Sequence, residues 1–292
     1  MTAGLAASIR ARLQNVARAR GEDFDLVLTR YAIERFLYRL SVVPARENYL
    51  LKGALLFDLW FDEPHRPTRD ADFLGFGLAD AEALRTTVRE ICAVAVDDGM
   101  EYDADSISID EIREDVRYGG LRARLGATLG NARSLVQLDV GYGDAVTPGP
   151  EEAVYPTLLN DQPPPRLRVY PRASVAAEKL EAIVSLGMIN TRMKDYFDLR
   201  ALAREGATNV EQLADAVVAT FRCRKTPLPS DIPLGLSDEF AHDAAKRAQW
   251  KAFLGKNRLD APSLEEAITE ILRFVAEPLR LARQRHASPR QA

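Results

Sequence analysis

Two aspartates separated by one residue, Asp70 and Asp72, are the part of the sequence best suited to chemistry. They follow a small-residue segment, 52–54 (Lys-Gly-Ala). Residues two apart in a strand point to the same side, so a strand over 69–76 would project both carboxylates together. Such a pair can hold two hard cations about 4 Å apart for in-line attack on phosphorus. A glycine turn can also bring backbone N–H groups against a triphosphate, and together these features predict nucleotidyl transfer.

The segments around this pair strengthen a signal that is weak alone, because most such acids lie in solvated loops. Residues 48–52 indicate a short strand that ends at Gly53, and 54–61 indicate one or two helical turns. A loop rich in structure-breaking residues, 62–68, then leads into the strand that carries the acids. This order is similar to the first unit of the polymerase-beta-type nucleotidyltransferase fold.

The sequence also resembles a specific family, the AbiEii/MenT-type nucleotidyltransferase toxins. Their first motif has Lys-Gly followed by Gly or Ser, a spacer, and Arg-x-Ser/Thr-x-Asp-Ile-Asp. This chain has Lys52 and Gly53, and then Arg-Pro-Thr-Arg-Asp-Ala-Asp over 66–72. Ala54 departs from the motif and offers no hydroxyl for a phosphate, and Ala71 replaces a bulky isoleucine.

Three further segments continue the resemblance, although each has an ordinary structural alternative. Asp139 lies near the end of a β-rich stretch, 134–141, where an aspartate can simply begin a turn. Lys179 lies in an amphipathic segment, where a lysine is normally on the solvated face. Residues 192–199 match the family pattern Arg-x-Lys-Asp-x-x-Asp-Leu, which could also be a helix start with charged residues in its first turn.

The resemblance implies a set of active-site residues and cofactors. It implies Mg²⁺ bound by Asp70, Asp72 and Asp139, with an NTP as substrate. Asp139 would complete the metal shell or accept a proton from the attacking hydroxyl. Lys179 would neutralise the departing pyrophosphate, and Asp195 is carried over as catalytic without a derived role. The residues implied in nucleotide binding are Lys52, Gly53, Ala54, Arg66, Thr68 and Lys194.

Composition is ordinary for a globular protein of 292 residues, with 47% hydrophobic and 28% charged residues. No apolar run reaches the roughly 18 residues that span a bilayer, and no secretory signal is visible. We interpret the Arg-bearing, acid-free first twenty residues as a helix rather than a transit peptide. Cys92 and Cys223 have neither metal-site nor disulfide spacing, so we expect a cytoplasmic protein without membrane contact.

Charge is uneven along the chain. Residues 1–20 and 273–292 each have a net charge of +4, which leaves −12 between them for the formal total of −4. Other basic groups are Arg222, Arg224 and Lys225, and, around the predicted central strands, Arg113, Arg117, Arg122, Arg124 and Arg133. Such groups can contact nucleic acid even in an acidic protein, or they can be solvated arginines on helix surfaces.

We predict an α+β fold, a polymerase-beta-type nucleotidyltransferase core with a mixed sheet followed by a C-terminal helical domain. Residues 1–170 would form the core with N-terminal helices, and 171–292 a helical domain that completes the active-site cleft. The first part has a helical segment to residue 41, a helix over 80–96, strands over 106–114 and 119–128, a linker over 144–165 and a strand over 166–170. The second part has helices over 173–187, 194–204, 208–221, 237–254 and 263–286.

The predicted function is that of a nucleotidyltransferase toxin from a toxin–antitoxin or phage-defence system, which transfers a nucleotide from an NTP to an acceptor. By resemblance, the acceptor is the 3′ end of tRNA and the partner is a cognate winged-helix antitoxin. Two alternatives stay open. In the first, a nucleotidyltransferase with the same acids modifies a protein or a small molecule. In the second, the chain is a catalytically inactive binding module of the same fold, for which Ala54 is the one supporting feature.

Overall fold

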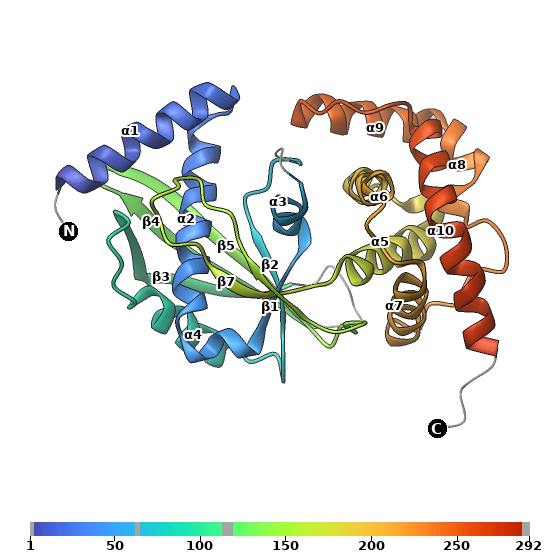
Figure 1. Cartoon of the computed structure of the whole chain (residues 1–292), viewed down its shortest axis with the longest axis horizontal. Coiled ribbons are helices and arrows are strands. Elements are labelled where there is room, and N and C mark those ends of the chain that lie inside the picture. The colour runs from blue at the N-terminus through green and yellow to red at the C-terminus, as the bar shows by residue number, and fades with distance from the viewer. Residues whose placement is uncertain (1–2, 62–64, 113–118, 288–292) are drawn as a thin grey trace. The chain divides into compact units, whose positions relative to one another are not determined.

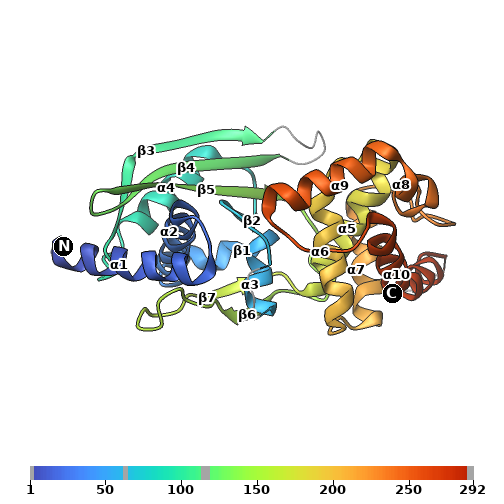
Figure 2. The same cartoon turned by 90° about the horizontal axis from the view of Figure 1, so that it is seen from above.

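The computed structural model describes residues 3–61, 65–112 and 119–287. The chain divides into two compact units (Figures 1 and 2). Unit 1 comprises Met1–Gly143 and Glu151–Val169, and unit 2 comprises Asp144–Pro150 and Tyr170–Ala292. A mixed sheet with helices in unit 1 and the helices of unit 2 confirm the predicted α+β fold class.

Unit 1 contains a seven-stranded sheet in the order β3-β4-β5-β2-β1-β7-β6. The strands are β1 (Tyr49–Lys52), β2 (Ala71–Gly75), β3 (Met100–Ile112), β4 (Gly120–Leu129), β5 (Ala132–Tyr142), β6 (Glu151–Val154) and β7 (Arg166–Val169). Strand β2 runs parallel to β5 and antiparallel to β1. Residues 113 and 114 of the predicted strand 106–114, together with Arg113 and Arg117, lie outside the described residues.

The prediction of a linker over 144–165 is wrong in part, because β6 lies within it and pairs antiparallel with β7. Its sequence, Glu-Glu-Ala-Val, has little intrinsic strand preference. Backbone pairing at the sheet edge supplies the strand conformation there, and local sequence does not report such pairing.

One face of the sheet is covered by helices α2 (Phe24–Ser41) and α4 (Ala81–Cys92), with α1 (Ala3–Arg20) beside them. Along β4, every second residue from Leu121 to Leu129 is buried, as expected for a strand with one covered face. The alternate positions of β4 and β5 are half-buried or exposed, and they include Arg122 and Asp139. The chemistry-bearing side chains of these strands therefore project from the face opposite the buried aliphatic residues.

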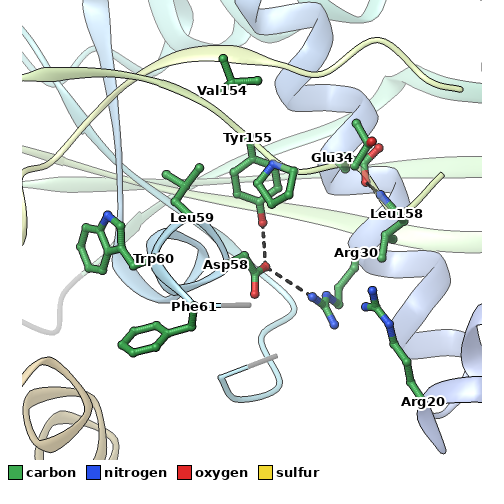
Figure 3. A pocket seen from close by; sticks show the side chains of 12 residues that line it. Arg20, Arg30, Glu34, Asp58, Leu59, Trp60, Phe61, Val154, Tyr155 and Leu158 are labelled. Atoms are coloured by element: carbon green, nitrogen blue, oxygen red, sulfur yellow. Dashed lines mark hydrogen bonds and ion pairs between the residues drawn. The ribbon is translucent and has the colours of Figure 1, made fainter. Parts of the chain in front are cut away.

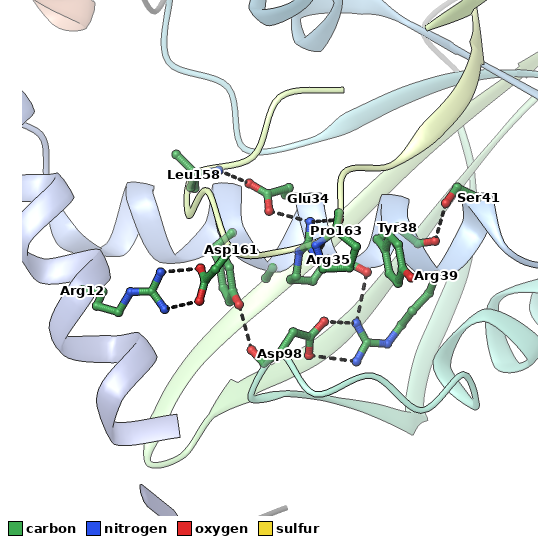
Figure 4. Close-up of polar contacts among 12 residues, drawn as sticks. Arg12, Glu34, Arg35, Tyr38, Arg39, Ser41, Asp98, Leu158, Asp161 and Pro163 are labelled. Atoms are coloured by element: carbon green, nitrogen blue, oxygen red, sulfur yellow. Dashed lines mark hydrogen bonds and ion pairs between the residues drawn. The ribbon is translucent and has the colours of Figure 1, made fainter. Parts of the chain in front are cut away.

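Ion pairs hold the N-terminal helices in place (Figure 4). Arg39 on α2 makes a bidentate contact with buried Asp98, at 2.5 and 3.0 Å. Arg12 on α1 pairs with Asp161 across 149 positions of sequence. Part of the basic charge of residues 1–20 is thus already compensated within unit 1.

Unit 2 is helical. Its α-helices are α5 (Arg172–Leu186), α6 (Met193–Glu205), α7 (Val210–Cys223), α8 (Asp238–His242), α9 (Ala244–Asn257) and α10 (Leu264–Ala287), and a short helix α3 (Phe57–Trp60) belongs to unit 1. The single helix predicted over 237–254 is wrong. Asp243 is extended between α8 and α9, and its carboxylate accepts from the backbone N–H of Lys246 at 2.8 Å, so an N-cap splits the segment. No helix among the described residues is long and apolar enough to cross a membrane.

Candidate active site

Strand register sets four charged residues in one row across the sheet of unit 1. Asp72 on β2 is the Cα partner of Asp139 on β5 and, on its other side, of Lys52 on β1. Asp139 is in turn the partner of Arg122 on β4. Directly paired residues on neighbouring strands share a face, so two carboxylates lie side by side with a cation at each end of the row.

Asp70 joins this row from the loop before β2. The strand begins at Ala71, two residues later than predicted, so strand alternation does not place Asp70. Instead, the Thr68 hydroxyl donates to Asp70 Oδ1 at 2.7 Å. One carboxylate oxygen from each of Asp70, Asp72 and Asp139 lies within 4.8 Å of the others. We refer to these three residues as the acidic triad.

The acidic triad fits a divalent metal ion. Its three half-buried carboxylates supply the hard oxygen ligands that Mg²⁺ and Mn²⁺ take. Three like charges at this separation repel one another, and a bound cation removes that repulsion. The donor set therefore agrees with the metal site implied by the sequence.

Gly53 makes room for Asp72. Its φ of +75° lies in the region that favours glycine. A Cβ atom at this position would lie 2.0 Å from Asp72 Oδ2 and 2.7 Å from Asp72 Cγ. The carboxylate of Asp72 thus packs directly against the backbone of the glycine turn, and no larger residue fits without moving it.

Arg122 holds the third acid. Its Nε donates to Asp139 Oδ1 at 2.7 Å and its second terminal nitrogen to Oδ2 at 2.6 Å. Asp139 is 14% exposed in this arrangement. A bidentate arginine fixes the orientation of a carboxylate and also occupies lone pairs that a metal ion would use. Arg122 therefore both positions Asp139 and offsets part of the charge of the acidic triad.

A second charged group lies in unit 2. Lys179 on α5 pairs with Asp195 at 3.2 Å and with Asp198 at 2.6 Å, both on α6. Arg192 also pairs with Asp195, at 2.7 Å. We call these four residues the lysine cluster, and its two cations match its two carboxylates.

Burial distinguishes the lysine cluster from an ordinary surface network. The side chains of Asp195 and Asp198 are 3% and 0% exposed, and that of Lys179 is 11% exposed. Burial alone would raise the pKa of Asp195, but the attraction of Lys179 and Arg192 outweighs it and the pKa is lowered from 3.8. The alternative that Lys179 is a solvated surface lysine is wrong.

The family described as "Nucleotidyl transferase AbiEii toxin, Type IV TA system" matches residues 35–274 of the chain. The chain belongs to this family. The predicted resemblance to the AbiEii toxins is thereby confirmed, and membership implies nucleotidyl transfer with an NTP substrate and an antitoxin partner. The comparison with curated proteins found no match to the sequence.

The chain is similar in structure to two solved proteins. The crystal structure of JHP933 from Helicobacter pylori has a TM-score of 0.50 at 15% identity, covering 90% of this chain and 95% of that one. A second H. pylori structure, described as a "putative nucleotidyltransferase", has a TM-score of 0.47 at 16% identity and covers 88% and 96% of the two chains. At such identity the first of these likenesses shows the fold alone.

The other residues implied by the AbiEii resemblance differ in their surroundings. Ala54 is buried, at 8% exposure, so its side chain offers nothing to a ligand. Thr68 is engaged with Asp70, which makes it a positioning residue for the acidic triad. Arg66 is half-buried and Lys194 is exposed at the start of α6. A role for Lys52, Arg66 or Lys194 in nucleotide binding stays a prediction.

Two residues of the charged groups were missed or left without a role at the sequence level. Arg122 appeared only as one of several arginines near the central strands, because its pairing with Asp139 depends on the register of β4 and β5. Asp198 had no derived role, yet it forms the shorter ion pair with Lys179. The sequence feature that could have identified Asp198 is its spacing from Asp195, because residues three apart lie on one helix face.

A pocket of about 400 Å³ also lies in unit 1, between α2, α3 and residues 154–158 (Figure 3). Within it, Asp58 accepts from the Tyr155 hydroxyl at 2.8 Å and pairs with Arg30 at 3.4 Å. No acidic-triad residue lines this pocket, so the acidic triad and this pocket are separate features of the described part of unit 1.

Proposed function

We propose that this AbiEii-family chain transfers a nucleotide from an NTP to the 3′-terminal hydroxyl of tRNA, in a Mg²⁺-dependent reaction, as the toxin of a toxin–antitoxin system that can serve phage defence. The observation that carries the proposal is the convergence of Asp70, Asp72 and Asp139 within 4.8 Å, which the chemistry of nucleotidyl transfer requires.

The residues of the acidic triad have separate tasks in this proposal. Asp70 and Asp72 would hold the metal ion, which supplies charge neutralisation of the triphosphate and activation of the attacking hydroxyl when bound. Asp139 would complete the ligand set or accept the proton of that hydroxyl. Thr68 orients Asp70 through its 2.7 Å hydrogen bond, and Arg122 orients Asp139.

The turn after β1 would receive the phosphates. Gly53 allows close approach of the main chain, so the backbone N–H groups of Gly53 and Ala54 are the donors that we assign to the triphosphate. Lys52 and Arg66 would add positive charge. These assignments rest on the family motif and on the position of Gly53 against Asp72.

Unit 2 would complete the active site. We assign to Lys179 the neutralisation of the departing pyrophosphate, with Lys194 assisting. In this assignment Asp195 and Asp198 fix the ammonium of Lys179 by their 3.2 and 2.6 Å contacts, so that its position does not have to be organised during the reaction. Asp195 is thus a positioning residue rather than a second metal ligand.

A flexible RNA 3′ end suits this chemistry as an acceptor, because a single strand can enter a site without unwinding a helix. The partner would be a winged-helix antitoxin. An acceptor that is a protein or a small molecule would use the same carboxylates, so the acceptor must be decided by experiment.

The decisive experiment incubates the purified chain with each labelled NTP in the presence of tRNA, total protein or an aminoglycoside. We expect label at tRNA 3′ ends with the parental chain, its loss on addition of EDTA, and its return with Mg²⁺. Asp72→Ala should transfer nothing. Label in protein or in the small molecule alone would refute the tRNA assignment, and transfer that survives EDTA would refute the metal assignment.

A growth experiment tests the toxin role. Induction of the parental chain in a bacterium without the antitoxin should arrest growth and leave extra nucleotides on sequenced tRNA 3′ ends, whereas Asp72→Ala should do neither. Arrest with unmodified tRNA would exclude tRNA as the target, and normal growth would contradict toxicity.

A further inference from the structure

Helix α9 and the two residues that follow it form a further basic segment, in addition to those at the two ends of the chain. From Ala244 to Leu259 the sequence has no acidic residue, in a chain of formal net charge −4. The same sixteen positions hold five cations: Lys246, Arg247, Lys251, Lys256 and Arg258.

One face of α9 anchors the helix to unit 2. Lys246, Trp250 and Phe253 are spaced four and three residues apart, as on a single helix face. Lys246 is buried and donates to the Asn190 carbonyl at 2.9 Å, and Trp250 donates to the Pro262 carbonyl at 2.9 Å. The ring of Phe253 stacks with that of Trp250 at 6.0 Å.

The cations away from this face are exposed. Arg247 and Lys251 are four residues apart and share one side of the helix, and Arg258 is the C-cap residue directly after it, in the left-handed conformation. Lys256 lies on another side. In the part of the chain that the structure describes, none of these four cations forms an ion pair.

The basic groups noticed in the sequence are different, because acids compensate many of them. Arg224 contacts Asp144, Glu178 and Glu181 at 3.1, 3.3 and 2.9 Å. Arg280 pairs with Glu277, and Arg285 with Glu211 and Asp215. Within the 222–225 group, Arg224 is therefore already compensated by acids of the same chain.

We propose that Arg247, Lys251 and Arg258 dock the phosphate backbone of the RNA acceptor. This inference rests on the proposed function, in which the acceptor is tRNA. The helix advances about 15 Å along its axis from Arg247 to its last residue, Asn257, and Arg258 follows directly. Phosphates recur every ~3.4 Å along each strand of a duplex, so the stripe spans about four of them.

The surface of α9 suits phosphates better than a protein partner. Protein interfaces depend on apolar or aromatic anchors at their centre. No large hydrophobic residue of α9 is among the exposed ones in the described chain. Cations that lack both apolar neighbours and compensating acids match the regular negative charge of a nucleic acid backbone.

The test measures binding of labelled tRNA to the full chain by fluorescence anisotropy over a range of KCl concentrations. The variant Arg247→Gln/Lys251→Gln/Arg258→Gln removes the stripe while keeping side chains that tolerate a helix. The matched control, Arg222→Gln/Arg273→Gln/Arg280→Gln, removes three exposed cations elsewhere in unit 2 and changes the net charge equally. Melting temperatures establish that both variants are folded.

We expect the α9 variant to bind tRNA about 10-fold to 100-fold more weakly, and its salt slope to fall by about 2 to 3, since each phosphate contact contributes about 0.7 to 0.9. The control should change affinity by less than about threefold, and NTP binding should be the same in all three proteins. Equal losses in the two variants, or a parental chain that does not bind tRNA, would overturn the inference. Unchanged tRNA binding with lost neutralisation by the antitoxin would assign the surface to a protein and overturn it as well.

The same samples separate this inference from the proposed function. Nucleotide transfer to tRNA is measured for the parental chain. Salt-dependent binding through α9 without any transfer would defeat the proposed function and leave the docking surface standing.

Discussion

The acidic triad of unit 1 and the lysine cluster of unit 2 differ in how their charged side chains are arranged. The triad gathers three half-buried carboxylates within 4.8 Å, and Arg122 pairs with one of them. The lysine cluster buries two carboxylates more deeply and matches them with two cations. An accumulation of like charge favours the binding of an added cation, whereas a buried network of paired charges fixes the orientation of its own side chains.

The largest expected effect is on activity at the acidic triad. Asp72→Asn should lower nucleotide transfer by at least about 100-fold, because a metal ligand at the reacting phosphate is lost. The free energy of unfolding should not fall, because one of three mutually repelling charges has been removed. A transfer assay with labelled NTP measures the first quantity and chemical denaturation the second. Glu101→Gln, at an exposed position on β3, is the control and should change neither quantity. A lower free energy of unfolding for Asp72→Asn would show that Asp72, like the acids of the lysine cluster, stabilises the fold.

The lysine cluster should respond in the opposite way. Lys179→Ala leaves buried Asp198 and Asp195 under-compensated and should cost about 3–5 kcal/mol of unfolding free energy. The double variant Lys179→Met/Asp198→Asn keeps the charges balanced and should recover most of that loss. Transfer should stay low in the double variant if Lys179 acts on pyrophosphate. Recovery of both stability and activity would make Lys179 a purely structural residue.

Gly53→Ala tests whether the turn sets the position of Asp72. The φ of +75° should cost about 1–2 kcal/mol for any side chain, and the Cβ contact with Asp72 should also weaken Mn²⁺ binding. Gly21→Ala is the matched control, because Gly21 has a φ of +64° with no atom within 4 Å of a built Cβ. Calorimetry should find the backbone cost in both variants and weaker metal binding only in Gly53→Ala. Equal Mn²⁺ affinities would show that Asp72 adjusts.

Arg122→Gln should raise the affinity of the acidic triad for Mn²⁺ about threefold to tenfold. Removing the bidentate cation frees both oxygens of Asp139 and makes the site more negative. Paramagnetic resonance of free Mn²⁺ measures this without turnover. Arg124→Gln, which removes a neighbouring β4 arginine bound to Asp110, should leave the affinity unchanged. Weaker Mn²⁺ binding in Arg122→Gln would mean that orientation of Asp139 outweighs competition for its oxygens.

The smallest effect concerns pH. The pKa of Asp195 is lowered from 3.8 in the folded state, so its contribution to stability is present above that value and is lost as pH falls through the lower folded pKa. Denaturation curves below about pH 4 should therefore show a smaller loss of stability with acid for Asp195→Asn than for the parental chain. Identical slopes would contradict the lowered pKa.

Local sequence was sufficient for most elements of both units. The helices over 80–96, 173–187, 194–204, 208–221 and 263–286 and the strands around the acid pair correspond to observed elements, because apolar spacing and turn residues act over short distances. The errors occurred where a distant strand or a cap decided the outcome, as in β6 and at Asp243.

The sequence by itself determined which residues could do chemistry: an acid pair after a glycine turn, a further aspartate, and a lysine with a helix-borne acid. Only the tertiary structure decided which of these residues lie next to one another. Asp72 and Asp139 are 67 positions apart, and a one-residue shift of β5 would turn Asp139 to the opposite face. Burial likewise made Lys179 part of a buried ion-pair network, and ion pairing distinguished the compensated arginines from the exposed cations of α9. Register, burial and pairing are long-range properties, which residue types and local spacing do not encode.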